Sequence, residues 1–229
     1  MNKKSISIII PVYNEELRLP ILLKKINKLS SFNNEIIIVD GGSTDNTTKV
    51  INNHSVKLIK SKKGRAIQMN VGASKASNEI LYFLHADTIP PNKFDEIIFT
   101  AFKSGKSSGS FRMKFEGSNV FLKISAFFTR YNFKICRGGD QSLFISKKIF
   151  NELNGYNEAF KYCEDLELID RIYENSMFVV LKNKVITSDR KFKKNGTTYL
   201  LLQFSIIHLI RFFGASPKII EKYYDMAIK

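Results

Sequence analysis

Four short apolar runs separated by amphipathic stretches occupy the N-terminal part of the chain, and they restrict the possible folds more than any other feature. The apolar runs cover residues 5–10, 35–39, 56–59 and 80–84. Runs of this length bounded by polar turn residues predict buried strands, and strands that alternate with helical patterns predict βαβ units. The sequence therefore predicts an α/β fold with a mostly parallel sheet flanked by helices.

The first connecting helix is expected to begin after Asn14, because asparagine is a good N-cap residue. Leu17, Ile21 and Leu22 recur at a spacing that places them on one face of this helix. We expect that face to pack on the sheet, while the lysine-rich opposite face lies in solvent.

The pattern is less regular after Asp87, where a Pro90-Pro91 pair interrupts it. No internal repeat or low-complexity linker occurs, so one domain with a helical C-terminal cap is expected over residues 1–229. Pro217 suits the start of the last helix. The other expected elements are a helix over about 92–103, a strand near 109–115, an amphipathic segment over 120–133 and an apolar helix over 199–213.

The charge balance favours anionic partners. Lysine and arginine total 36 against 21 acidic residues, which gives a formal net charge of +15 and attracts phosphates, nucleic acid or acidic lipid headgroups. Cys136 and Cys163 lack the spacing of a zinc site and the density of a disulfide scaffold. Because residues 6–10 are too short an apolar run for a signal peptide, we expect a cytoplasmic protein.

The two apolar helical segments in the second half leave membrane contact open. Residues 199–213 are shorter than the about 20 apolar residues of a membrane span, and Gln203, His208 and Arg211 interrupt them. They could lie on a membrane surface, as could residues 120–133. We favour two helices that pack on the core, because aromatic stripes at helical spacing usually face a core.

Polar residues gather where each predicted strand ends. In open parallel sheets the ligand binds beyond the carboxyl ends of the strands, so these residues are expected to meet at one edge. The clusters are residues 11–15, 40–45, 63–65 and 85–87.

The second cluster suits a nucleotide. Gly41 and Gly42 permit a tight turn with close backbone approach, and Asp40 can accept hydrogen bonds from ribose hydroxyls or a base edge. The alternative is an ordinary strand-to-helix turn capped by Ser43 or Thr44. Neither a GxGxxG nor a GxxxxGK[ST] pattern occurs, so a dinucleotide fold and a P-loop are not supported.

Two acidic positions can carry chemistry. Asp87 ends the fourth apolar run, where a carboxylate can hold a hard divalent cation that bridges pyrophosphate oxygens. His85 is left open between a strand-end histidine and a ligand, because magnesium and manganese prefer oxygen. Glu164 and Asp165 begin an amphipathic helix, where acidic residues often only complement the helix dipole.

These segments together resemble the family-2 inverting glycosyltransferases with the GT-A nucleotide-sugar fold. The chain is most similar to the subgroup described as radical-SAM or selenodomain-associated transferase 2, through GRAIQMN, HADT, GDQ, residues 186–190 and the apolar C-terminal helices. The family's motifs occur in order as IIIPVYNE at 8–15, VDGGSTDNT at 39–47, GRAIQMNVGA at 64–73, LYFLHADT at 81–88, GDQ at 139–141 and CEDLEL at 163–168.

The resemblance implies a nucleotide-binding part over residues 1–90, with a donor that is a nucleotide-diphosphate sugar, most simply a UDP-sugar. Asp87 matches the last carboxylate of the family's DxD metal motif, which implies Mg²⁺ or Mn²⁺ at the diphosphate. His85 stands where the family has the first acidic residue. The residues implied at the donor are Pro11, Tyr13, Glu15, Asp40, Gly41, Lys63, Gly64, Arg65, Ala86 and Asp87.

The resemblance also implies an acceptor and catalytic part over 91–195, followed by C-terminal helices over 196–229. Asp165 matches the base that deprotonates an acceptor hydroxyl, with Glu164 as an acceptor contact or support. Residues Gly139, Asp140 and Gln141 are implied beside the sugar and acceptor, and Arg190 near phosphate. The acceptor itself is unspecified; a lipid-linked or phosphorylated molecule and peripheral membrane contact suit the basic charge.

Other functions stay open at this point. A relative that binds nucleotide sugars without catalysis would keep the same motifs, and the His85 substitution gives a reason to consider it. A nucleotidyltransferase would need Gly-rich and lysine motifs near the N-terminus that the chain lacks. A nucleic-acid-binding module would suit the net charge, but the lysines are dispersed and the strand ends are acidic.

Overall fold

The computed structural model describes residues 4–51 and 56–228, which form an 8-stranded sheet. The strand order is β3-β2-β1-β4-β7-β6-β8-β5. The first four of these strands run parallel to one another, as predicted, and β7 pairs antiparallel with β4. The strands are β1 (Ser7–Val12), β2 (Glu35–Asp40), β3 (Lys57–Lys60), β4 (Ile80–Phe83), β5 (Thr88–Ile89), β6 (Ser108–Phe115), β7 (Leu143–Ser146) and β8 (Phe178–Thr187).

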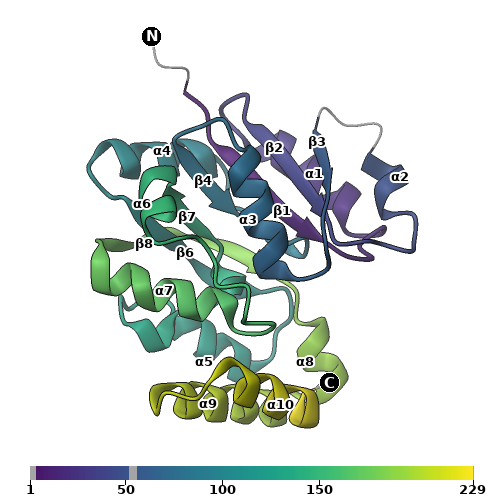
Figure 1. Cartoon of the computed structure of the whole chain (residues 1–229), viewed down its shortest axis with the longest axis vertical. Coiled ribbons are helices and arrows are strands. Elements are labelled where there is room, and N and C mark those ends of the chain that lie inside the picture. Colours follow the sequence, from purple (N-terminus) through teal and green to yellow (C-terminus); the bar gives the residue numbers. More distant parts are fainter. Residues whose placement is uncertain (1–3, 52–55, 229) are drawn as a thin grey trace.

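Helices cover both faces of this sheet, and the last two lie at one end of the molecule (Figure 1). β6 and β8 run parallel to each other in the second half of the sheet, which completes the expected mostly parallel α/β architecture. The helices are α1 (Leu19–Leu29), α2 (Thr47–Ile51), α3 (Arg65–Lys75), α4 (Phe94–Lys103), α5 (Val120–Phe128), α6 (Lys147–Glu152), α7 (Glu164–Asn175), α8 (Arg190–Asn195), α9 (Thr197–Phe212) and α10 (Pro217–Ala227), with short 3-10 turns η1 (Lys134–Cys136) and η2 (Gly139–Gln141).

Strand β1 is buried along its whole length because it lies between two helical layers. Ile8 and Ile10 pack in the cluster that includes α1, whereas Ile9 points to the other face and packs with α3. Each such side chain stabilises the fold by about 2 kcal/mol when it is fully buried. At Gly72, an added Cβ would lie 2.5 Å from Ile9 Cγ2, so α3 can approach the sheet this closely only through a glycine.

The expected start of α1 after Asn14 is wrong. The helix begins at Leu19, and Asn14 has a positive φ of 55° while its Oδ1 accepts a 2.8 Å hydrogen bond from the Thr44 amide. The left-handed residue turns the chain and delays the helix, so the buried face also differs. Leu17 and Ile21 are 79% and 57% exposed. The face that packs on the sheet comprises Leu19, Leu22, Leu23 and Ile26.

The second half confirms most expected elements and corrects one. Helix α5 ends at Phe128 rather than continuing to residue 133, and Leu122 is its buried side chain. Residues 120–133 therefore pack on the core only in part: α5 contacts β6 and places Leu122 and Ala126 against the core, while its other large apolar side chains are exposed. Helix α9 does bury Leu200, Gln203 and Ile207, and it contacts both α5 and α10. Within residues 4–51 and 56–228, no helix is long and apolar enough to cross a bilayer.

Candidate active site

A cavity of about 1250 Å³ opens beyond the carboxyl ends of β1 and β4 and extends to α5, α9 and α10. Three of the four strand-end clusters reach it, as the predicted parallel sheet requires. Lys191, Tyr162 and Tyr224 also line it, although no motif in the sequence marks them, and so does Ser188 of the segment 186–190. The predicted residues on its wall are Pro11, Tyr13, Glu15, Arg65, Ala86, Asp87, Gly139, Asp140, Gln141, Asp165 and Arg190.

The second strand-end cluster does not line this cavity. Asp40 is 3% exposed, and its carboxylate accepts hydrogen bonds from the amides of Gly42 and Ser43 at 3.2 and 3.1 Å. Gly42 has a φ of 86°, which favours glycine. Asp40 therefore stabilises the turn that follows β2.

Gln68 on α3 holds the ends of the two central strands together, and sequence reasoning missed it. Its Nε2 donates to the carbonyls of Val12 and Val39 at 2.8 and 2.7 Å. A Cβ at Gly41 would lie 3.0 Å from the Gln68 side chain, so this glycine makes room for the amide. The amide thereby fixes the floor of the cavity beside β1.

Tyr13 and Lys63 form a contact at the rim. The Lys63 Nζ lies 3.6 Å from the centroid of the Tyr13 ring, and the ring is 37% exposed. A cation at this distance is held by the ring quadrupole. Gly64, with a φ of 146°, then turns the chain into α3, so that Arg65 at the first position of the helix reaches the cavity.

Asp87 lies beside a guanidinium from the other end of the chain. The Arg190 Nη2 lies 2.8 Å from Glu15 Oε1 and 3.8 Å from Asp87 Oδ2. The Ser188 amide also donates to the Asp87 carbonyl at 3.2 Å. These contacts hold the start of α8 across the ends of β1 and β4, and they place Arg190 beside Asp87, the predicted ligand of the divalent cation.

His85 lies between two carboxylates. Its Nδ1 is 3.6 Å from Asp140 Oδ1, and its Nε2 is 3.7 Å from Asp165 Oδ2. Burial lowers the pKa of His85, but the adjacent Asp140 and Asp165 carboxylates outweigh this effect and raise the pKa to about 9. The imidazole is therefore protonated at neutral pH and links the two acidic residues.

Asp165 is almost buried at the start of α7, and Gly139 in η2 leaves space for it. A Cβ at position 139 would lie 2.0 Å from Asp165 Oδ2. Gln141, at the end of η2, is 3% exposed and accepts a 2.7 Å hydrogen bond from Arg137 Nη1. Arg137, which sequence reasoning missed, also donates to the carbonyls of Thr129 and Tyr131 and so fixes the loop that carries η2.

Glu164 faces away from the cavity and is completely buried. Its Oε1 lies 2.7 Å from Arg65 Nε, yet neither carboxylate oxygen meets hydrogen-bond geometry with a partner among the described residues. Burial raises the pKa of Glu164, and the nearby Arg65 partly offsets the rise. The Glu164 carboxylate thus pairs with Arg65 on the side away from the cavity. The Arg65 side chain is 44% exposed and lines the cavity.

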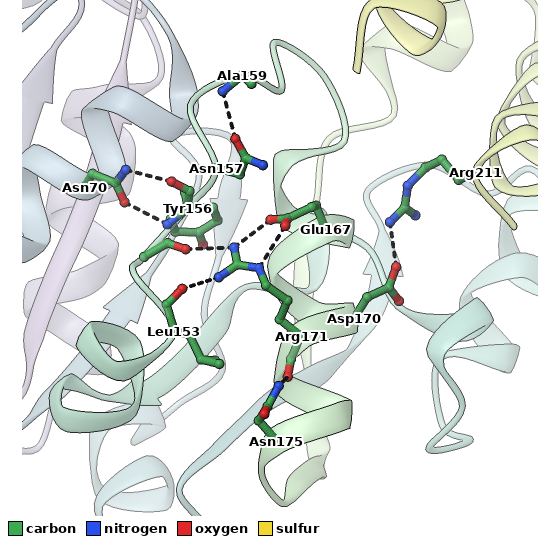
Figure 2. Close-up of polar contacts among 11 residues, drawn as sticks. Asn70, Leu153, Tyr156, Asn157, Ala159, Glu167, Asp170, Arg171, Asn175 and Arg211 are labelled. Carbon is green, nitrogen blue, oxygen red and sulfur yellow. Dashed lines mark hydrogen bonds and ion pairs between the residues drawn. The ribbon is translucent and has the colours of Figure 1, made fainter. Parts of the chain in front are cut away.

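A polar network fixes the segment before α7 and so positions Asp165 (Figure 2). Arg171 donates to the carbonyls of Leu153 and Gly155 and pairs with Glu167. Asn70 of α3 donates to the Tyr156 carbonyl at 2.9 Å and accepts from the Tyr156 amide at 2.8 Å. These hydrogen bonds connect α3 and α7 through the loop 153–156, which holds the two helices in place relative to each other.

Helix α10 covers the far side of the cavity. Tyr224 stacks on Tyr162 with ring centroids 3.8 Å apart, and the Lys191 Nζ donates to its hydroxyl. Lys161 pairs with Glu221 and Asp225 at 2.7 and 3.2 Å. These residues are distant in sequence and belong to no motif, so only the fold reveals that they meet.

The donor set suits a divalent cation only in a limited way. Among the residues that the structure describes, no three His, Cys, Asp or Glu side chains are grouped to hold a metal ion. Asp87 offers one carboxylate on the cavity wall, and both His85 nitrogens face carboxylates instead. A single carboxylate plus substrate phosphates is nevertheless a usual magnesium environment. The residues therefore fit a cation that arrives with a diphosphate.

Known glycosyltransferases are similar to this chain in sequence. The family model for glycosyl transferase family 2 matches residues 7–164. The succinoglycan biosynthesis protein ExoA of Rhizobium meliloti is 25% identical over 189 residues, which cover 72% of this chain and 57% of that protein. The undecaprenyl-phosphate 4-deoxy-4-formamido-L-arabinose transferase of Yersinia pestis is 29% identical over 135 residues, 54% of this chain and 41% of that protein.

Solved structures of GT-A glycosyltransferases share the fold. The mannosyltransferase PcManGT from Pyrobaculum calidifontis, in complex with GDP-Man and Mn²⁺, superimposes with a TM-score of 0.72 at 16% identity, covering 96% of this chain and 69% of that one. TarS of S. aureus in complex with UDP gives a TM-score of 0.68 at 19% identity over 80% of this chain and 60% of that one. The expected GT-A fold is confirmed, and the chain belongs to glycosyl transferase family 2.

Proposed function

We propose that the chain transfers a sugar from a nucleoside-diphosphate donor to an acceptor hydroxyl with inversion at the anomeric carbon. The observation that carries the proposal is that Asp87 and Asp165 line the same cavity, with His85 beside Asp165, in a family 2 glycosyltransferase domain. Two solved relatives contain UDP or GDP-Man, which supports a nucleotide-sugar donor. We assign residues 1–90 to the donor side, 91–195 to the acceptor side and 196–229 to the covering helices.

The donor is held at the end of β1. Tyr13 and Lys63 offer an aromatic face and a cation for the nucleoside and its phosphates, and Pro11 and Glu15 complete that wall. Arg65 and Arg190 place two guanidinium groups on the cavity, where they can bind phosphate oxygens. Asp87 would hold the divalent cation, which neutralises the negative charge that develops on the departing diphosphate.

Asp165 is proposed as the base on the acceptor side. Its carboxylate removes the proton from the acceptor hydroxyl, the resulting oxygen forms the new bond to the anomeric carbon, and the bond from that carbon to the diphosphate oxygen breaks. His85 and Gly139 keep the Asp165 carboxylate in place, the first by charge and the second by leaving space. Asp140 and Gln141 lie beside it on the same wall.

Calorimetry with UDP and GDP, each with and without Mn²⁺, tests the donor site. We expect metal-dependent binding of UDP that Asp87→Ala weakens and Asp165→Asn leaves unchanged. In an assay for nucleoside diphosphate release from a sugar donor, both variants should lose turnover. Turnover by Asp165→Asn at the parent rate would refute the proposed base, and unchanged metal-dependent binding by Asp87→Ala would refute the proposed cation ligand.

Two finer assignments go with this proposal. The radical-SAM-associated subgroup stays a prediction from GRAIQMN, HADT and GDQ. A cytoplasmic location, at the inner face of a membrane where the acceptor is lipid-linked, also stays a prediction; the Yersinia relative is named for an undecaprenyl-phosphate substrate. If the chain binds nucleotide but releases no sugar from any donor, it is a binding protein that has lost catalysis.

A further inference from the structure

Helix α5 and the loop after it expose a continuous series of large apolar side chains. Each of these side chains is at least 43% exposed, whereas Leu122 is the side chain that α5 buries. Monomeric proteins rarely expose apolar groups in such a series without a partner. We call this series the apolar platform; it comprises Val120, Phe121, Ile124, Phe127, Phe128, Tyr131, Phe133 and Ile135.

The segment that carries the apolar platform is basic. Residues 117–139 contain no acidic residue, and Lys123 and Arg130 are exposed cations in this segment. Lys134 pairs with Glu174 of α7 at 3.0 Å, and Arg137 is buried. The guanidinium of Arg130 lies 3.5 Å from the centroid of the Phe127 ring, so a cation is held directly on the platform. Large apolar and aromatic side chains mixed with lysine and arginine on a short helix are typical of a segment that lies in a membrane interface.

Helix α9, which packs against α5, also exposes large apolar side chains. They include Leu202, Leu209 and Phe212, which are 56% to 83% exposed. Residues 190–220, which include α8 and α9, contain no acidic residue and six lysines or arginines. Three of these cations pair with carboxylates, namely Arg190 with Glu15, Lys193 with Asp189 and Arg211 with Asp170. Lys194 and Lys218 are exposed, so an anionic lipid surface would meet these two cations together with the apolar groups of α9.

The apolar platform is continuous with the active-site cavity. Phe128 and Ile135 belong to the platform and also line the cavity. Behind them the wall is apolar, with Met113, Phe115 and Phe204, and Lys191 and Lys194 lie on the same wall. The cavity thus opens where the platform is exposed, and an amphiphilic molecule could pass from one to the other.

We propose that the apolar platform docks on the surface of an anionic lipid bilayer. A second copy of the chain is the less favourable occupant, because two such platforms would bring like charges together with no acidic residue from either segment to compensate. The bilayer supplies what the platform lacks, namely negative charge beside an apolar phase. This inference concerns where the enzyme acts and does not depend on the sugar donor.

Vesicle co-sedimentation of the full chain tests the proposal. We expect binding to vesicles of equimolar phosphatidylglycerol and phosphatidylcholine, weaker binding to pure phosphatidylcholine, and a loss of binding as salt is raised. The double variant Phe121→Ser, Ile124→Ser removes two platform side chains that do not line the cavity and should bind roughly tenfold or more weakly. Lys123→Glu should weaken binding to the anionic vesicles alone.

Leu17→Ser, Ile21→Ser is the matched control, because these side chains are at least as exposed but lie on the β1–α1 connection and on α1. It should bind vesicles as the parent does, and thermal unfolding should show that all variants fold. Absence of binding to anionic vesicles at low salt would overturn the proposal, as would equal losses in the two double variants. A dimer in sedimentation equilibrium that only the platform variant abolishes would assign the surface to a second copy. Nucleotide calorimetry on the same samples tests the donor site separately.

Discussion

Replacement of Gly139 by alanine is expected to displace the Asp165 carboxylate. The added Cβ would lie 2.0 Å from Asp165 Oδ2 and 2.7 Å from its Cγ, and it would lie 3.1 Å from His85 Cε1. Because Cβ atoms essentially never approach another heavy atom within 3.0 Å, the carboxylate or η2 must move by about 1 Å. The cause is steric, since Gly139 has no positive φ in this structure.

The size of the effect follows from the role of Asp165. Misplacement of a catalytic group by about 1 Å costs roughly 100-fold in rate, or about 2.7 kcal/mol of transition-state stabilisation. The same crowding should lower the free energy of unfolding by about 1–3 kcal/mol. Donor binding should change little, because Gly139 lies on the acceptor side.

The assay is nucleoside diphosphate release from the sugar donor, together with thermal unfolding and nucleotide calorimetry. Gly138→Ala is the matched control, because a Cβ at position 138 would meet nothing within 4 Å and the backbone there is extended, with a φ of −169°. Gly139→Ala should turn over far more slowly than Gly138→Ala at the same nucleotide affinity. Equal turnover by the two alanine variants would refute the argument that Asp165 must stay at this position.

Three further predictions concern the buried groups around the site. Arg65→Ala should lower the free energy of unfolding, measured by chemical denaturation, by about 2 kcal/mol at neutral pH, because it leaves the buried Glu164 without its cation. Lys63→Ala is the control at an exposed position nearby, and it should lower the free energy of unfolding by about 0.5 kcal/mol or less. Burial raises the pKa of Glu164 above its ordinary value of 4.5, so the folded state holds that proton more tightly, and the free energy of unfolding falls as pH rises above 4.5. Glu164→Gln should reduce this fall in denaturation curves measured across that pH range. An unchanged dependence of the free energy of unfolding on pH would contradict the raised pKa of Glu164. Burial, with a smaller contribution from Glu164, raises the pKa of Cys163 to about 11. Alkylation of Cys163 by iodoacetamide at about pH 8, followed by peptide mass spectrometry, should therefore be roughly 100-fold slower in the folded chain than in urea. Equal rates in the two conditions would show that the Cys163 thiol is not buried in this way.

The nucleotide-side half of the fold was predictable because its signals are local. A short run such as residues 36–39, rich in β-branched residues and bounded by turn residues, favours a buried strand, and parallel strands bring their carboxyl ends together whatever covers them. Tyr13, Arg65 and Asp87 follow directly from that rule. Asn14 was misread because a residue with a high preference for N-caps also tolerates the left-handed conformation, and here its side chain serves the neighbouring turn instead.

The acceptor side was less predictable because it is assembled from residues far apart in the chain. Tyr162 meets Tyr224, and Lys161 meets Glu221, only after α10 has returned across the cavity. The basic residues at 190, 191, 193 and 194 are a local signal, but they do not specify a partner. Apolar periodicity likewise shows that one face of a helix avoids water without showing what covers it, so α5 was assigned to the core.

The two ends of the cavity differ in chemistry, with charged side chains at the donor end and exposed apolar side chains at α5. At the donor end, Arg190 lies 2.8 Å from Glu15 and 3.8 Å from Asp87. At the other end, the Phe128 and Ile135 side chains are 51% and 73% exposed, on either side of a loop whose backbone Arg137 holds. Specific hydrogen bonds suit a donor whose nucleotide must be recognised in one orientation, whereas an apolar opening suits an acceptor that enters by its apolar part. The variants at Phe121 and Ile124 should therefore change access of amphiphilic acceptors while the affinity for nucleotide stays constant.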